Sequence, residues 1–369
     1  MNVISWVMAI FAVSGAVDLI FGNRLGLGKE FEKGMMMLGT LALTMAGMIV
    51  LAPFIAHYLF PALKSLSTII PFEPSVVAGL LLANDMGGAT LATEFASSEA
   101  IGAYNGLVVA SMMGATVSFT LPFALGATEQ SQRKNLMLGL MCGVCGIPVG
   151  CIVAGLLCGL SFGAVLFDLY PLLLFSAIIV FGLWRFPNAS VKVFNVVGII
   201  VKTVVTAGLT VGIVEALLDI KILPYAAPIS DAFAIVEDVA LIEAGAFPLV
   251  YIASKLLKKP LQSLGKKSGI NETAALGFLS TLATSVTTFG MMKDMDERGV
   301  LLNSAFAVSA AFTFADHLAF TLSFRPSYVP FVIVGKLISG VAALAVAVLL
   351  FCRKKTETLQ AATQVVDEK

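Results

Sequence analysis

The chain has 369 residues, of which 23 are basic and 23 are acidic, and hydrophobic residues make up 58% of it while charged residues make up only 12%. A soluble domain is about half apolar and about a quarter charged, so this composition, with its mean hydropathy of +0.96, excludes an ordinary soluble protein and predicts an integral membrane protein. The balanced charge, without a long basic block, excludes a nucleic-acid-binding surface.

Apolar runs of roughly 20 residues, enough to cross the hydrocarbon core, recur along the chain. In chain order they are Ile4–Phe21, Met35–Phe60, Gly102–Gly126, Leu136–Phe162, Ala164–Trp184, Val196–Leu218, Ala232–Leu256, Val300–Leu322 and Val329–Cys352. The first has no basic stretch before it and no small-residue cleavage site, so we expect a retained span rather than a signal peptide. We therefore expect one all-α membrane domain over residues 1–352 and a polar cytoplasmic tail over residues 353–369.

A polar stretch, "LLANDMGGATLATEFA", follows the second of these runs. Non-helical backbone at membrane depth survives only where it is buried in protein or lines a wet cavity. Two half-helices are therefore predicted to meet at an unwound tip, where Gly87 and Gly88 permit the turn. The backbone groups that lose their helical hydrogen bonds at this tip can bind a solute. At this tip we expect Asp85 to pair with an ammonium group. Asn84 would either bind a hydroxyl or satisfy the broken backbone, and Glu94 is either a second counter-charge or an interfacial residue.

The chain repeats itself at an offset of 198 residues, which places Gly79 on Gly277 and Asn105 on Asn303. The same offset aligns the polar stretch with "TLATSVTTF", where Thr287 and neighbouring hydroxyls stand in place of the carboxylate and amide. The loop after Leu256 is rich in lysine, whereas its repeat partner holds a single lysine. Because cytoplasmic loops collect Lys and Arg, one loop is inside and the other outside.

The two copies, about 34–162 and about 232–352, are therefore predicted to be inverted in the membrane, as in many secondary transporters. If Pro74–Ala96 and Asn271–Met292 are re-entrant or broken helices, about nine spans remain and the N-terminus lies outside. If both segments cross fully, the count becomes eleven.

Ten acidic but only three basic residues fall within the predicted spans and re-entrant segments, and five acids and two bases remain when those near segment ends are left out. An acidic membrane interior favours a cationic solute. We expect Asp316, beside His317, and Glu243 to contribute to its site. The partner of Asp316 is predicted to be His317, Lys336 or Lys202.

Several segments resemble the bacterial ethanolamine transporters of ethanolamine-utilisation operons, the EutH type. They are "GLLLANDMGGATLATEFA", "ASMMGATVSFTLPFALG", "GIPVGCI", "INETAALGFLSTLA", "MMKDMDERG" and "AFAVSAAFTFADHLAFT", which together span about Glu32 to Gly340. The resemblance implies a multi-pass protein of the bacterial cytoplasmic membrane that brings ethanolamine to a catabolic pathway, often one housed in a microcompartment.

We therefore predict an alternating-access permease for ethanolamine, with its site near mid-membrane between the two broken segments. Coupling to protons or sodium, or none, stays open at this point, as does another small cationic or zwitterionic solute carried by a coupled transporter. A channel-like facilitator for an amine or ammonia is less favoured, because it needs few buried carboxylates. No enzymatic motif such as HExxH or GxSxG occurs, so no enzyme, cofactor or metal is expected. A homodimer or homotrimer in the lipid bilayer is expected by analogy.

Overall fold

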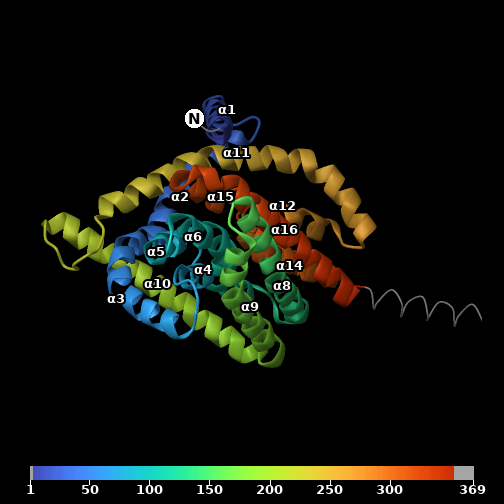
Figure 1. Cartoon of the computed structure of the whole chain (residues 1–369). Helices are drawn as coiled ribbons and strands as arrows, with labels where there is room; N and C mark the ends of the chain where they lie inside the picture. Colours follow the sequence, from blue (N-terminus) through green and yellow to red (C-terminus); the bar gives the residue numbers. More distant parts are fainter. Residues whose placement is uncertain (1–2, 353–369) are drawn as a thin grey trace, which may run out of the picture.

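A computed structural model describes residues 3–352, and all regular secondary structure in this range is helical (Figure 1). The predicted polar tail, residues 353–369, lies outside the described residues. Within the described residues, six helical stretches are long and apolar enough to cross a membrane, and Ile4–Ile20 is apolar but shorter. The six are Leu27–Ile69, Glu99–Leu125, Gln130–Leu157, Phe162–Arg185, Pro187–Leu218 and Pro326–Phe351. The prediction of an all-helical membrane protein is therefore confirmed.

Each predicted span corresponds to one helix or to a run of joined helices. The first four units are α1 (Val3–Ile20); α2 (Leu27–Leu41) with η1 (Ala42–Ala46) and α3 (Gly47–Ile69); α6 (Glu99–Ala103) with η3 (Tyr104–Gly114), η4 (Thr116–Thr120) and α7 (Leu121–Ala127); and η5 (Gln130–Gln132) with α8 (Arg133–Leu157). The others are α9 (Phe162–Arg185), α10 (Pro187–Leu218), α11 (Ile229–Ser268), α14 (Glu297–Ala310) with α15 (Asp316–Phe324), and η7 (Pro326–Tyr328) with α16 (Val329–Ala347) and η8 (Val348–Cys352).

The predicted span Val300–Leu322 is not one continuous helix, because the helix breaks between α14 and α15. Phe312 has a φ of 61° at this break, which ends the helical path. The freed backbone groups find partners in a neighbouring segment: the Phe312 N–H donates to the Thr281 carbonyl at 3.2 Å, and the Phe314 N–H donates to the Leu282 carbonyl at 2.9 Å. The break is therefore stabilised by tertiary contacts, since unpaired backbone groups at this depth would be costly.

The first polar segment, hairpin 1, consists of α4 (Ser75–Leu81), the kinked tip η2 (Asn84–Gly88) and α5 (Ala89–Phe95). Its two ends meet at a common base. The backbone N–H and the hydroxyl of Ser97 donate to the two carboxylate oxygens of Glu73, at 2.9 and 2.8 Å. A segment whose ends are joined in this way turns back on itself.

The second polar segment, hairpin 2, consists of α12 (Glu272–Ala283) and α13 (Ser285–Met291), followed by η6 (Met292–Asp294). Its base is also closed by hydrogen bonds. The Asn271 backbone N–H donates to the Asp296 carboxylate, and the Asn271 side-chain amide donates to the Asp294 carbonyl, both at 2.8 Å. Asn271 lies 198 residues after Glu73, at the offset predicted for the repeat, and each of the two residues closes the base of its hairpin.

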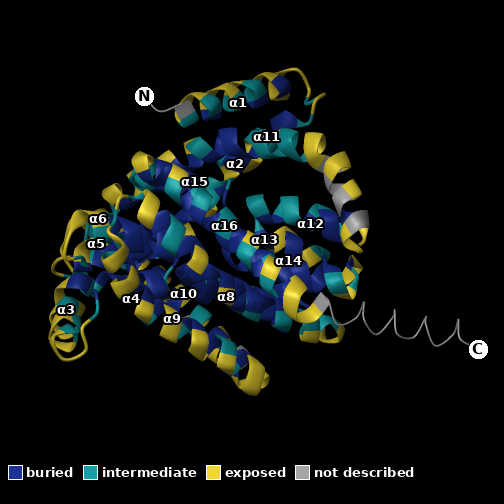
Figure 2. Cartoon of the chain, turned by 45° about the vertical axis from the view of Figure 1, so that its right-hand side comes forward, coloured by how far each residue is buried: buried dark blue, intermediate teal, exposed yellow. Residues whose placement is uncertain are grey.

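The two hairpins lie among helices whose interior is closely packed (Figure 2). A row of glycines on α8 lets this helix approach its neighbours: Gly143 faces Val308 and the Ala305 carbonyl on α14, and Gly150 faces the Gly335 carbonyl on α16. Small residues serve this purpose in membrane helices because no hydrophobic force drives them together. In contrast, α9 and α10 expose large apolar side chains such as Phe181 and Ile199, which suits a face in contact with lipid.

Candidate functional site

The tip of hairpin 1 is a turn held by its own backbone and by one neighbouring helix. Gly87 has a φ of 94°, a conformation that side chains disfavour. The Ala83 carbonyl accepts hydrogen bonds from the N–H groups of Met86 and Gly88, at 3.1 and 2.9 Å. The Ala83 N–H donates to the hydroxyl of Ser118 on η4 at 3.2 Å. These contacts fix the direction in which Asp85 leaves the tip.

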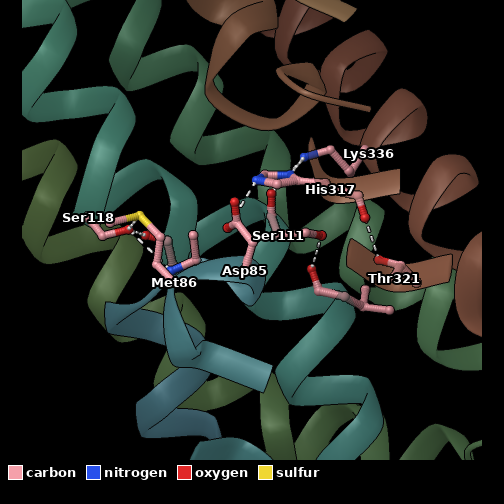
Figure 3. Close-up of polar contacts among 10 residues, drawn as sticks. Asp85, Met86, Ser111, Ser118, His317, Thr321 and Lys336 are labelled. Atoms are coloured by element: carbon pink, nitrogen blue, oxygen red, sulfur yellow. Dashed lines mark hydrogen bonds and ion pairs between the residues drawn. The ribbon is translucent and has the colours of Figure 1, made fainter. Parts of the chain in front are cut away.

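Asp85 faces a buried polar chain that joins both halves of the molecule (Figure 3). The His317 ring lies at its centre, at the start of α15. Its Nε2 is 3.9 Å from the Asp85 carboxylate, and its Nδ1 is 2.9 Å from the Nζ of Lys336 on α16. The Lys336 amino group also donates to the Ser111 carbonyl at 2.7 Å.

A cavity of about 210 Å³ opens in front of Asp85 and is shared by both halves. Its polar lining comes from Asp85, Asp316, His317, Thr40, Thr44 and Thr284. Phe119 and Phe312 are among its apolar walls, and their rings meet edge to face with centroids 5.4 Å apart. Ligand pockets for drug-sized molecules hold about 300–1,000 Å³, so this cavity suits a smaller solute.

A further carboxylate lies behind Asp316. Glu243, in the middle of α11, is fully buried; its carboxyl group lies within hydrogen-bond range of the Asp316 carboxyl, and no N–H or hydroxyl group among the described residues donates to it. It lies within electrostatic reach of Asp316 and Asp85, and of Lys33 on α2. Long α11 arches over one side of the molecule (Figure 1). The region around the cavity thus collects three acidic side chains.

The structure brings most of the predicted site residues together. Asp85, Asp316 and His317 line one cavity, and Glu243 stands beside them. Gly87 and Gly88 form the tip and are buried there. Asn84 is fully buried at the same tip, and its amide oxygen and nitrogen have no hydrogen-bond partner.

Two predicted site residues lie elsewhere. Glu94 is exposed on α5, beyond the tip and close to the base of the hairpin, because the half-helix runs away from the cavity. Thr287 is exposed on α13 and lines a separate hollow between α11 and hairpin 2, whereas Thr284 and Val286 reach the cavity from this hairpin. The geometry supports neither Glu94 nor Thr287 as a contact of a solute in this cavity.

The partners predicted for deep charges also need correction. Lys202, one expected partner of Asp316, is exposed on α10. His317 and Lys336 instead pair with each other and with Asp85. Glu215 is one of the five acids that the sequence places away from the segment ends. It lies in the last turn of α10 and accepts hydrogen bonds from the N–H groups of Ile222 and Leu223, at 2.8 and 2.9 Å.

The sequence analysis missed Thr40 and Thr44, which line the cavity from the α2–η1 helix. Their spacing of four residues puts both hydroxyl-bearing side chains on one helical face, and this signal was available in the second apolar run. The two aromatic walls carried no such signal, because the chain has 26 phenylalanines.

Comparisons with known proteins agree with this picture. The family model described as "Ethanolamine utilisation protein, EutH" matches residues 1–350. A protein of Listeria monocytogenes named probable ethanolamine permease EutH is 44% identical over 95% of this chain and 94% of its own length. The protein of that name from Salmonella typhimurium is 36% identical over 95% of both chains. The uncharacterized protein YxeR of Bacillus subtilis is 37% identical over 94% of both chains.

No solved structure matches the chain. The family match and the relatives extend along almost the whole sequence, including the hairpin tips, the helix break and the helices that enclose the cavity. This chain therefore belongs to the EutH family of ethanolamine utilisation proteins.

Proposed function

We propose that this protein is a permease that takes up ethanolamine across the bacterial cytoplasmic membrane by alternating access. The observation that carries the proposal is the gathering of Asp85, Asp316 and Glu243 around one small cavity between two interrupted helices. Buried carboxylates in a membrane interior mark the route of a cation. The relatives named probable ethanolamine permease support the choice of substrate.

The cavity offers a matching group for each part of ethanolamine. The ammonium would lie between Asp85 and Asp316, with Glu243 adding negative charge from behind. Phe119 and Phe312 provide aromatic faces, which attract cations. The hydroxyl of the substrate would meet the hydroxyls of the threonines that line the cavity. Lys336, held by His317 and Ser111, offsets part of the acidic charge while the cavity is empty.

Alternating access would rest on an inverted repeat with nine spans and two re-entrant hairpins. Matching contacts in the two copies support this arrangement. Gly79 on α4 packs against Asn105, and Gly277 on α12 packs against Asn303, 198 residues later in both cases. The two hairpin bases are also closed at equivalent positions. One membrane domain with copies of about 34–162 and about 232–352 follows from this arrangement.

The acidic site argues against the rival functions. A channel-like facilitator for a neutral amine needs an apolar pore, whereas three carboxylates here surround the route. We propose a non-enzymatic carrier that assembles as a homodimer or homotrimer, which light scattering of the detergent-solubilised protein would test.

The test of the function is uptake of radiolabelled ethanolamine into proteoliposomes. Saturable uptake by the wild type that falls at least tenfold in Asp85→Asn would support the proposal, with the exposed Glu94→Gln as a matched control that keeps its activity. The presence or absence of a proton or sodium gradient in the same assay decides the coupling. Normal uptake by Asp85→Asn would contradict the role of the tip, and no uptake by the wild type would contradict ethanolamine as the substrate.

A further inference from the structure

A second polar cluster lies at the base of hairpin 1, at the opposite end of the hairpin from the cavity. It consists of Glu73, Ser75, Ser97, Asn105 and Asp168, which we call the base cluster. The negative charge of its first acid is stabilised by hydrogen bonds: the Glu73 carboxylate accepts them from the Ser75 hydroxyl at 3.2 Å and from the N–H and hydroxyl of Ser97. The cluster continues through the Asn105 amide, which donates to the Ser75 hydroxyl at 2.9 Å.

The second acid, Asp168 on α9, has no such hydrogen bonds to stabilise a negative charge. Its side chain is 2% exposed, and neither carboxylate oxygen has a hydrogen-bond partner. It lies beside the Asn105 amide without reaching hydrogen-bond geometry, and within electrostatic reach of Glu73. None of the ion pairs among the described residues includes Asp168. The nearby Tyr104 hydroxyl is directed elsewhere, to the Cys151 carbonyl.

The Asn105 side chain provides a further free ligand atom. It is fully buried, and its amide oxygen has no hydrogen-bond partner although its nitrogen is bonded to Ser75. The cluster thus presents three unpartnered oxygen atoms, two from Asp168 and one from Asn105, next to the oxygens of Ser75 and Glu73. Carboxylate, amide and hydroxyl oxygens are the ligands that hard cations prefer.

The predicted second copy has the asparagine of this arrangement but not the acid. The Asn303 nitrogen, at the position that corresponds to Asn105, donates to the backbone carbonyls of Ala274 and Gly299, at 2.9 and 3.0 Å, and its amide oxygen is unpartnered like that of Asn105. No residue of the second copy corresponds to Asp168, because α9 lies between the two copies. The uncompensated carboxylate therefore belongs to hairpin 1 alone and does not follow from the repeat itself.

We propose that the base cluster binds a sodium ion, coordinated by Asp168, by the Asn105 amide oxygen and by the oxygens of Ser75 and Glu73. A buried carboxylate is either neutralised by a proton or paired with a cation. Glu73 already has three hydrogen-bond donors, so an ionised Asp168 leaves one negative charge to balance, and a monovalent cation balances it. The ion would tie the hairpin base to η3 and α9. This site is distinct from the ammonium cavity and does not depend on the transported substrate.

The test measures sodium binding rather than transport. Purified protein in detergent would be melted in NaCl, KCl, CaCl₂ or choline chloride, and binding of radioactive sodium would be measured directly. We expect the melting temperature of the wild type to rise with sodium in a saturable way, but not with choline. Asp168→Asn should lose both the shift and the binding, and should melt above the sodium-free wild type because its buried charge is gone.

Three further variants keep the result interpretable. Glu237→Gln, an exposed acid on α11, and Asp85→Asn, in the cavity, should retain the sodium response. Asn105→Ala removes a ligand but no charge, and should weaken sodium binding at least tenfold, which covers the case in which Asp168→Asn does not fold. An equal melting temperature of the wild type in sodium and choline would overturn the proposal, as would a response to calcium alone or a full sodium response in Asp168→Asn.

Discussion

Replacing Gly87 by alanine tests whether the tip of hairpin 1 requires glycine for two separate reasons. The first is conformational, because Gly87 has a φ of 94°. The second is steric, because an added Cβ would overlap the buried side chain of Met48 on α3. Two other glycines separate these effects. Gly159 has a φ of 82° but nothing close to an added Cβ, and Gly290 on α13 has neither constraint.

The expected changes in the free energy of unfolding follow from these differences. A left-handed conformation costs a residue with a Cβ about 1–2 kcal/mol, so Gly159→Ala should destabilise by about that amount. Gly87→Ala should lower the free energy of unfolding by the same conformational cost and by a further ~1–3 kcal/mol, because the added methyl group overpacks against Met48. Gly290→Ala should be neutral or stabilising by about 0.5–1 kcal/mol, since alanine is preferred in a helix.

The measurement is reversible unfolding of the three variants in mixed detergent micelles, followed by circular dichroism. The predicted order of stability is Gly290→Ala, then Gly159→Ala, then Gly87→Ala. If Gly87→Ala is as stable as Gly159→Ala, the Met48 side chain moves away without cost and the steric half of the reasoning fails. If Gly87→Ala matches Gly290→Ala, the tip does not need a positive φ at all.

Three further predictions concern charges. Lys336→Met leaves two buried acceptors without their donor and should lower the free energy of unfolding by about 1–3 kcal/mol, measured in the same micelles; unchanged stability would contradict the polar chain. Glu243→Gln should reduce ethanolamine uptake at least tenfold while Glu94→Gln stays within about twofold of wild type, and equal effects of both would refute the assignment of the cavity. Asp18→Asn weakens three hydrogen bonds from backbone N–H groups at the α1–α2 turn, so it should melt at a lower temperature and still transport; loss of uptake by stably folded protein would contradict a purely structural role.

The tip of hairpin 1 could be predicted from the sequence because its signal is local. Asp85 and the glycine pair interrupt an apolar run, and a carboxylate at membrane depth is rarely accidental. Glu94 shared the same composition signal but lies outside the cavity, because α5 is only seven residues long and leads away from the tip. Local sequence does not reveal how far a half-helix runs or which face it turns to its neighbours.

The features that escaped the sequence analysis depend on contacts between distant segments. Phe312 adopts a positive φ without glycine or proline nearby, and hydrogen bonds to backbone carbonyls of hairpin 2 stabilise this break. Asp168 lies close to the start of an apolar run, a position at which an acid can be interfacial, yet it is buried where α4 and α8 pack against α9. The π-helical geometry of η3 could not be predicted either, because its composition resembles that of any apolar span.

The two hairpin tips are attached unequally to the helices beside them. The Ala83 N–H of hairpin 1 donates to the side-chain hydroxyl of Ser118, and Asp85 at the same tip faces His317, whereas hairpin 2 accepts two backbone hydrogen bonds from the α14–α15 break. Tip 1 is thus held through side chains, one of which a cation bound at Asp85 can compete for, and tip 2 through backbone bonds that a solute in the cavity does not replace. If the hairpins are the gates of the carrier, substrate binding acts first on hairpin 1. The charge pattern of the loops predicts that this hairpin faces outside, where an uptake system meets its substrate.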